Sequence, residues 1–197
     1  MPRPRKASDD EIFGAAVRVM SRVGPAELTL SEIAREAGLT AGALVQRFGG
    51  KKELLHQMAS QLAGSTEDAM AALRARNPSA LGALRAYARG WARMAESPEA
   101  LARNLAYLQL DLTDPDLYES LAKQARATRK AFEKLLAEAV DAGELPAGTD
   151  VPALARAVEV LLSGALMTWA VHREGKADRF LLRELDGLLA LAGRKPT

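Results

Sequence analysis

The segment between Thr29 and Thr40 constrains the fold most, because it carries the start and stop signals of a helix at fixed spacing. Thr29 and Glu32 have the spacing of a capping box, in which a hydroxyl and a carboxylate each satisfy a free backbone N–H at a helix start. Apolar residues then recur on one helical stripe, at Leu30, Ile33, Ala34 and Ala37. Gly38 can take the left-handed conformation that closes a helix. The sequence therefore predicts a helix over residues 30–37.

A second, shorter helix is predicted directly after it, over Ala41 to Phe48, with Thr40 as its N-cap. Leu44 and Phe48 are spaced four apart and are expected to face inward. The side chains expected to face outward are Ala41, Gly42, Ala43, Gln46 and Arg47. Small residues allow close approach to DNA, while glutamine can pair with adenine and arginine with guanine or a phosphate. The two helices predict a helix-turn-helix; the alternative is that the small residues are filler and Arg47 is a solvated charge.

Residues 8 to 58 resemble the DNA-binding domain of the TetR (tetracycline repressor) family of bacterial transcriptional regulators. Four pieces match the family in order. They are Ile12, Ala15, Ala16, Val19 and Gly24 for the first helix, Thr29 to Ala34 for the second, Ala37 to Thr40 for the turn, and Phe48 to Leu55 for the exit. The exit corresponds to the family's Phe-x-x-Lys-x-x-Leu entrance to a fourth helix.

The chain departs from the family pattern at Val45, where the family often has Tyr, and at Gly50, where it often has a Ser or Thr cap. The resemblance implies that Lys51, at the start of the fourth helix, joins free N–H groups in holding a phosphate. The predicted DNA-binding residues are Arg3, Arg5, Thr29, Thr40, Ala41, Gly42, Ala43, Val45, Gln46, Arg47 and Lys51.

The distribution of charge agrees with a nucleic-acid partner. Residues 1–60 hold nine Lys or Arg against seven Asp or Glu, so the whole net charge of +2 lies in this part of the chain. Arg3, Arg5 and Lys6 form a basic arm ahead of the first helix, stiffened by proline. Such arms reach into a minor groove or along the backbone, or they are tails whose charges aid solubility.

Other signals bound the class of protein. The chain has no Cys, so it has no disulfide framework and no Cys-ligated metal site. Its basic start is not followed by an apolar run, which excludes a signal peptide. No apolar stretch is expected to approach the roughly 18 residues that a membrane span needs. We therefore expect a cytoplasmic protein that does not bind a membrane.

The whole chain is predicted to be all-α, because no segment alternates apolar and polar residues with the period of a strand. Ser8 and Glu11 repeat the capping-box spacing at the first helix. The nine expected helices run over residues 9–23, 30–37, 41–48, 51–74, 79–95, 98–110, 115–142, 151–173 and 177–192. We assign residues 1–50 to a three-helix DNA-binding domain with its basic arm, and 51–197 to a helical domain for effector binding and dimerisation.

The resemblance implies that the second domain binds a small-molecule effector. Its aromatic and Met residues suggest an apolar or aromatic compound, although any one of them can equally be plain core. The candidate ligand-binding residues are Trp91, Met94, Asn104, Tyr107, Leu108, Phe132, Met167 and Trp169.

The resemblance also implies that the last two helices form a homodimer interface. The candidates are Leu161, Gly164, Ala165, Leu181, Leu185, Leu188 and Leu189, and the alternative is that these leucines pack within their own chain. A dimer suits the short reading helix, because two such helices about 34 Å apart can read a palindromic operator.

An enzyme is the competing class of protein. Its strongest candidates for a metal or acid-base cluster are Asp111, Asp114, Asp116 and Glu119. Asp114 before Pro115 is instead an ordinary helix start, and neither histidine has a Cys or His at ligand spacing. We predict no catalytic residue, metal site or cofactor. The prediction is a homodimeric repressor released from a palindromic operator by a small molecule. The alternatives are a regulator controlled by a protein partner or by no ligand, and an all-α enzyme or binding protein without DNA recognition.

Overall fold

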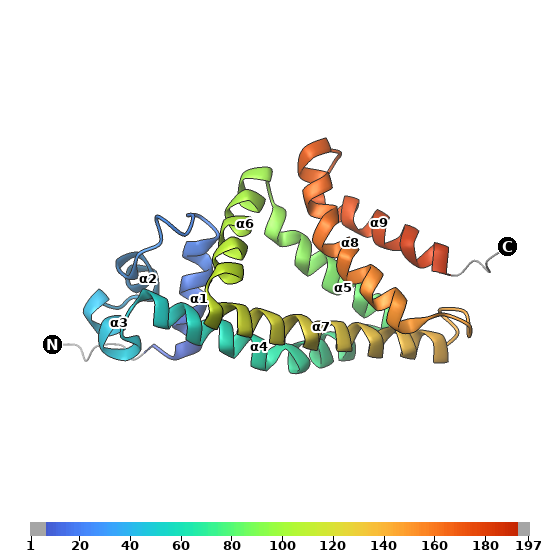
Figure 1. The fold of residues 1–197 in the computed structure, drawn as a ribbon, viewed down its shortest axis with the longest axis horizontal. Coiled ribbons are helices and arrows are strands. Elements are labelled where there is room, and N and C mark those ends of the chain that lie inside the picture. Colours follow the sequence, from blue (N-terminus) through green and yellow to red (C-terminus); the bar gives the residue numbers. More distant parts are fainter. Residues whose placement is uncertain (1–6, 193–197) are drawn as a thin grey trace. The chain divides into compact units, whose positions relative to one another are not determined.

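The computed structural model describes residues 7–192, and over this range the chain forms α-helices and one short 3-10 helix without any strand (Figure 1). The elements are α1 (Asp9–Met20), α2 (Leu30–Ala37), α3 (Ala41–Phe48), α4 (Lys51–Ala75), α5 (Ala80–Ala92), η1 (Arg93–Ala95), α6 (Pro98–Thr113), α7 (Pro115–Asp141), α8 (Val151–His172) and α9 (Ala177–Ala192). The predicted all-α class is confirmed. The largest differences are at α1, which ends before the expected Val23, and at α6, which continues past residue 110.

Local capping accounts for the starts of the first helices. Ser8 and Glu11 form both halves of a capping box at α1. At α2 only half of the predicted box forms: the Thr29 hydroxyl accepts from the Glu32 N–H, and the Glu32 carboxylate accepts from that hydroxyl instead of from the Thr29 backbone. Gly38 closes α2 with a φ of 70°, in the left-handed region that favours glycine.

The chain divides into two compact units. The first holds the residues up to Ala63 together with Ala102–Lys123, and the second holds Gly64–Leu101 and the residues from Gln124 onward. Both α4 and α7 contribute to each unit. The assignment of function to residues 1–50 and 51–197 stays a prediction, since the compact units divide the chain elsewhere.

In the first unit, α6 packs against the segment that follows α1, although the two are far apart in sequence. The Tyr107 hydroxyl donates to the Val23 carbonyl at 3.1 Å, and Arg103 Nε donates to the Ser21 carbonyl at 3.3 Å. Burial raises the pKa of Tyr107 to about 12, so this hydroxyl keeps its proton. The core of this unit includes Ile12, Leu28, Ile33, Leu44 and Leu54, all fully buried.

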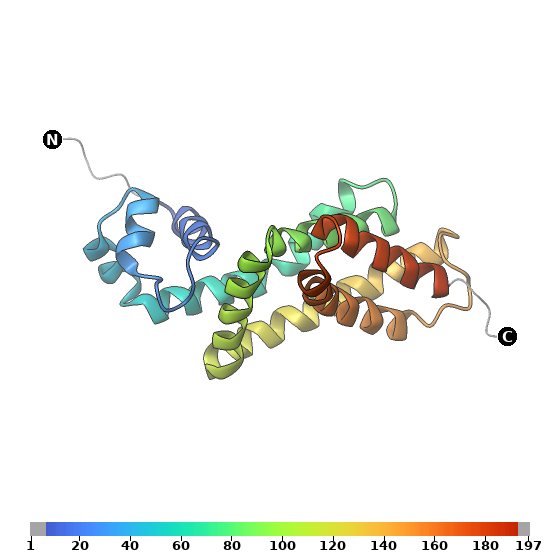
Figure 2. The same ribbon diagram turned by 90° about the horizontal axis from the view of Figure 1, so that it is seen from above.

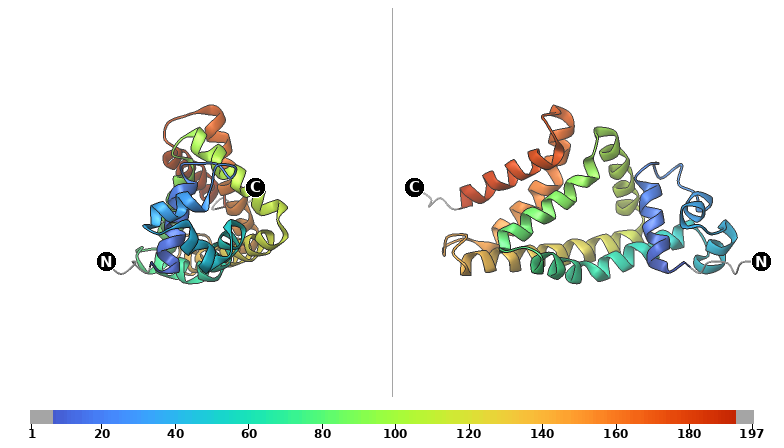
Figure 3. Two further views of the ribbon diagram at one scale, coloured as in Figure 1. Left: turned by 90° about the vertical axis from the view of Figure 1, so that its left-hand side faces the viewer. Right: turned by 180° about the vertical axis from the view of Figure 1, so that it is seen from behind.

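The second unit contains an aliphatic core to which α5, α7, α8 and α9 contribute. Figure 2 shows α8 and α9 side by side, with Leu181 and Leu185 of α9 fully buried. The C-terminal half of α4 lies along α7 (Figure 3), and Arg74 Nε is 2.8 Å from Glu138 Oε2. Tyr87 stacks on Trp91 and contacts Phe132 edge to face.

One helix corrects the expectation that no apolar stretch approaches the length of a membrane span. By length and composition α8 is long and apolar enough to cross a membrane, with a mean hydropathy of 1.5. The core helix of a soluble protein passes the same test, and 39% of its apolar window is buried inside the protein. Seven residues of α8, including Leu162, Leu166 and Trp169, are buried. Two charged residues, Arg156 and Glu159, interrupt the apolar run in the sequence, so the run looks shorter than the apolar helix that contains it.

Candidate functional site

The reading helix α3 separates an inward face from an outward face as predicted. Leu44 is fully buried and Phe48 nearly so, and the Phe48 ring lies 5.7 Å from that of Phe13 on α1. Gly42, Val45 and Gln46 are exposed. Thr40 caps the helix by accepting from the Ala43 N–H at 3.2 Å. The outward face therefore carries only small side chains in the first turn, and its larger side chains lie in the last turn.

Arg47 has partners in its own chain that the sequence did not indicate. Its guanidinium donates to the Ala7 carbonyl at 2.6 Å and lies 2.8 Å from the Asp9 carboxylate. These contacts tie the end of α3 to the start of α1. A base or phosphate must compete with these contacts for Arg47. The other polar side chain of α3, Gln46, makes no such contact with the described residues.

Lys51 lies at the start of α4, as the resemblance requires, and its side chain bends towards α2. Its Nζ donates to the Leu28 carbonyl at 3.0 Å, next to Thr29, the N-cap of α2. An ammonium has three donors, so this bond leaves donors for a phosphate. Thr29 and Thr40 are both exposed. Arg3 and Arg5 lie outside the described residues.

Two ion pairs to one carboxylate hold α2 against α1 and the residues that follow it. The Glu36 carboxylate accepts from Arg18 Nε and from Arg22 Nη2, each at 2.8 Å. Hydrogen bonds from Arg18 first, and then from Arg22, hold the pKa of Glu36 below its usual value. These contacts position the helix that precedes the reading helix.

The candidate ligand-binding residues are divided between the two units. Asn104, Tyr107 and Leu108 belong to the first unit, where Tyr107 is a packing residue. In the second unit Phe132 and Trp169 are buried, and Trp91 is half-buried with its Nε1 donating to the Leu162 carbonyl. Met94 is half-buried, whereas Met167 is 48% exposed on α8. Their role in ligand binding stays a prediction.

The second unit also has a cavity that the sequence did not indicate, between the C-terminal half of α4 and α7. Its volume is about 450 Å³. Met70 and Leu135 are buried at its apolar side, while ion pairs join Arg74 to Glu138 and Lys130 to Glu67 among its lining residues. The lining residues of each helix recur at the spacing of one helical face, but that spacing does not show which other helix this face meets.

The candidate dimer residues fall into two groups. Leu181, Leu185 and Leu189 are buried in their own chain, which is the alternative that the sequence left open for these leucines. Leu161, Gly164, Ala165 and Leu188 line a shallow groove over α8 and α9. Three large apolar side chains not singled out from the sequence are exposed on the same helices, at Val160, Val171 and Leu191.

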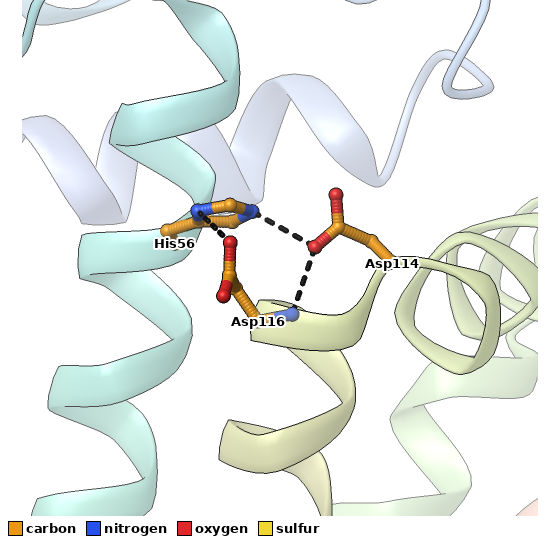
Figure 4. A group of neighbouring side chains, drawn as sticks. All are labelled: His56, Asp114 and Asp116. Carbon is orange, nitrogen blue, oxygen red and sulfur yellow. Dashed lines mark hydrogen bonds and ion pairs between the residues drawn. The ribbon is translucent and has the colours of Figure 1, made fainter.

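A further cluster joins residues that are far apart in sequence. His56 of α4 lies beside Asp114, the residue before α7, and Asp116 in its first turn (Figure 4). Lys52 Nζ is 2.9 Å from Asp114 Oδ2. The hydrogen bond from Lys52 is the largest cause that lowers the pKa of Asp114 to about 2, so this carboxylate is ionised at neutral pH. The spacing of residues in the sequence does not reveal this cluster, because only the fold brings α4 and the start of α7 together here.

Comparison with known proteins matches both parts of the chain. Residues 12–58 match the family described as "Bacterial regulatory proteins, tetR family". Residues 80–185 match the family described as "Tetracyclin repressor-like, C-terminal domain". The HTH-type transcriptional regulator BetI 2 of Chromohalobacter salexigens is 39% identical over 64 residues, which are 32% of this chain and 31% of that relative. The chain thus matches less than a third of the length of BetI 2.

Solved structures resemble the chain over nearly its full length. The TetR transcriptional regulator SCO0520 from Streptomyces coelicolor is 28% identical with a TM-score of 0.69, over 92% of this chain and 98% of that one. SmeT, the repressor of the Stenotrophomonas maltophilia multidrug efflux pump SmeDEF, shares the fold in its complex with triclosan. That match has 24% identity and a TM-score of 0.66, over 94% of this chain and 91% of SmeT. With its helix-turn-helix and both family matches, this chain belongs to the TetR family of bacterial transcriptional regulators.

Proposed function

We propose that the protein is a homodimeric repressor that binds a palindromic operator through α3 and leaves it when a small molecule binds. The observation that carries this proposal is the outward face of α3, where exposed Gln46 stands beside the small residues Gly42 and Ala43. Such a face can lie close to base edges in the major groove. The proposal includes a cytoplasmic location, because the operator lies there.

The DNA-binding step is tested by selecting binding sites from a random DNA pool and measuring fluorescence anisotropy at two salt concentrations. We expect a palindrome with tight, salt-dependent binding. Gln46→Ala should reduce discrimination at one base pair of each half-site by about 1–3 kcal/mol. Lys51→Ala should weaken binding to all sequences alike and flatten the salt dependence.

Lys176→Ala removes the same charge from the second unit and serves as the control for Lys51→Ala. It should leave affinity and salt dependence unchanged. If both lysine variants behaved alike at low salt, the phosphate contact assigned to Lys51 would be wrong. Failure to enrich any palindrome would favour a module that has lost DNA recognition.

The dimer step rests on the exposed apolar side of α8 and α9. Val160 and Val171 are 72% and 79% exposed, and Leu191 is 62% exposed. A second copy would remove this apolar surface from water. Sedimentation should show a dimer at micromolar concentration, and Val160→Glu should convert it into a monomer. Val17→Glu makes the same change at an exposed valine of α1 and should leave the dimer intact.

The effector step rests on the cavity between α4 and α7. Its volume of about 450 Å³ suits a small molecule, and its buried Met70 and Leu135 with charged neighbours suit an apolar compound with a polar end. The complex of SmeT with triclosan supports an effector of aromatic character. Because α4 runs from Lys51 to Ala75, it can couple the cavity to the DNA end.

A library of apolar and aromatic compounds should contain molecules that raise Tm and release DNA together. To empty an operator from 99 to 1 per cent, the effector must favour the non-binding state by about 5.5 kcal/mol. Ala131→Phe, which fills the cavity, should abolish release, whereas Ala125→Phe at an exposed site of α7 should preserve it. Tight operator binding that no compound relieves would favour control by a protein partner or by no ligand.

A further inference from the structure

The cluster of His56, Asp114 and Asp116 lies within the first unit and is distinct from the reading helix, the cavity and the α8–α9 surface. His56 Nε2 is 3.2 Å from Asp114 Oδ1, and His56 Nδ1 is 3.8 Å from Asp116 Oδ2 (Figure 4). One potential ligand atom from each residue lies within 4.8 Å of the others. The side chains therefore converge from two helices on one small volume.

His56 Nε2 is buried and makes no hydrogen bond with the described residues. Its short distance to Asp114 Oδ1 lacks the geometry of a hydrogen bond. A buried polar atom without a partner destabilises the folded state, so Nε2 requires an acceptor, a donor or a metal ion. The Asp114 carboxylate is already oriented by the N–H groups of Asp116 and Leu117, at 3.0 and 3.3 Å. The structure thus presents a positioned carboxylate next to an unsatisfied imidazole nitrogen.

We propose that His56, Asp114 and Asp116 bind a divalent first-row transition-metal ion such as zinc. His56 Nε2 is the nitrogen ligand, since both nitrogens of one ring cannot bind the same ion. Ligands at the usual bond lengths of 2.0–2.1 Å around a tetrahedral zinc ion lie about 3.3 Å apart. The observed 3.2 Å between His56 Nε2 and Asp114 Oδ1 is already close to this separation. The Asp116 carboxylate lies 3.8 Å from the other ring nitrogen, Nδ1, so this exposed side chain must turn towards Nε2 to reach the ion.

The donor set selects the class of metal. One imidazole and two carboxylates suit zinc, cobalt or nickel, whereas calcium and magnesium favour sites made of oxygen atoms alone. Three protein ligands leave a position for water, as in many zinc sites. Lys52 competes for Asp114, but its side chain is 59% exposed and is free to turn into solvent when the ion brings its own positive charge.

An ion pair is the competing explanation of the same geometry. A protonated His56 between two carboxylates would also account for the two short distances, as ion pairs with no metal involved. The two explanations differ in one measurable respect, because only the metal site gives a saturable response to zinc or cobalt. Neither depends on DNA binding, so the proposal stands or fails apart from the proposed function.

The test uses the full chain without a histidine tag, freed of metal by a chelator and titrated with Zn²⁺ or Co²⁺. We expect one ion per chain, visible Co²⁺ absorption typical of low coordination, and a Tm increase of roughly 5–10 °C at a hundredfold excess of Zn²⁺ over its Kd. His56→Gln should abolish all three responses. His172→Gln removes the only other histidine of the chain and should preserve them.

Asp116→Asn provides a second test, because Asp116 is exposed and its replacement should not disturb folding. It should weaken Zn²⁺ binding at least tenfold. Helix content measured by circular dichroism without metal identifies any variant that fails to fold. A wild-type chain that gives no response, or a His56→Gln chain that responds like the wild type, would overturn the metal site.

Discussion

The reading helix α3 and the helix α8 differ in how clearly their sequences separate a buried face from an exposed one. In α3 the large apolar residues Leu44 and Phe48 are buried, and polar Gln46 is exposed. In α8 large apolar residues lie on both sides: Leu166 is buried, and Val171 is 79% exposed. A helix that is apolar all round does not reveal which face meets its own core. A surface that binds another copy of the chain is therefore found from the structure, where tertiary packing leaves large apolar side chains exposed to water.

The largest expected effect tests the buried side of α9. Leu181→Ala should destabilise the protein by about 2–5 kcal/mol, because a fully buried leucine leaves a cavity when it is truncated. Urea denaturation measures this loss, and sedimentation should still show a dimer. Leu112→Ala makes the same change on α6, at a site that is 55% exposed and lies outside the proposed dimer surface, where the loss should stay within about 0.5 kcal/mol. Dissociation of the dimer by Leu181→Ala with little loss of stability would break the comparison.

The reading helix should respond in the same way at its inward face. Leu44→Ala should lower the free energy of unfolding by roughly 2–5 kcal/mol, since Leu44 is fully buried in the first unit. The neighbouring Val45 is 48% exposed, so Val45→Ala should cost much less. Chemical denaturation of both variants gives the difference. Similar losses for the two would mean that α3 is not packed through Leu44.

The sequence predicted the starts of α1, α2 and α3 well because their signals are local. Ser8 and Thr40 act as N-caps, and Gly38 ends α2, as their residue types and spacing indicate. Each of these signals depends on residues within one or two helical turns. The all-α class and the family followed from the same signals.

The missed features depend on pairs of residues that no local pattern connects. His56 meets Asp114 only because α4 lies beside the start of α7. Arg47, which is predicted to contact DNA, also forms an ion pair with Asp9 at the start of α1, and no local pattern indicated this partner. The Tyr107 hydroxyl donates to the Val23 carbonyl, a contact that its place in the sequence did not indicate, while its role in ligand binding stays a prediction. Tertiary contacts decide which partner each of these side chains has, and such contacts cannot be derived from the local patterns of a single sequence.

A smaller expected effect is the pH dependence of stability that the carboxylate of Asp111 on α6 causes. Asp111 lies in the last turn of that helix, where a negative charge is unfavourable, and burial raises its pKa to about 6. The folded state therefore binds this proton more tightly than the unfolded state, and stability should fall as pH rises from about 4 to about 6. Asp111→Asn should remove this slope and raise Tm by a few degrees at pH 7. Thermal melts across that pH range measure it.

The matched control for Asp111 is Asp141→Asn, which changes an exposed aspartate at the end of α7. It should leave the slope between pH 4 and 6 in place. An unchanged slope in Asp111→Asn would assign the pH dependence to another carboxyl group.

The smallest effect concerns the start of α4, where this chain departs from the family pattern. Gly50 accepts from the Leu54 N–H at 3.1 Å and does not need a positive φ, so a serine there can act as an N-cap. Its Cβ would lie 2.6 Å from Glu53 Oε2, the end of a flexible side chain that can turn away. Gly50→Ser should therefore stabilise the protein by a few tenths of a kcal/mol in urea denaturation. Gly49→Ser is the contrast, since its φ of 92° should cost about 1–2 kcal/mol. If Gly50→Ser cost as much as Gly49→Ser, Glu53 would be fixed in place, and the glycine at the start of α4 would be required by packing.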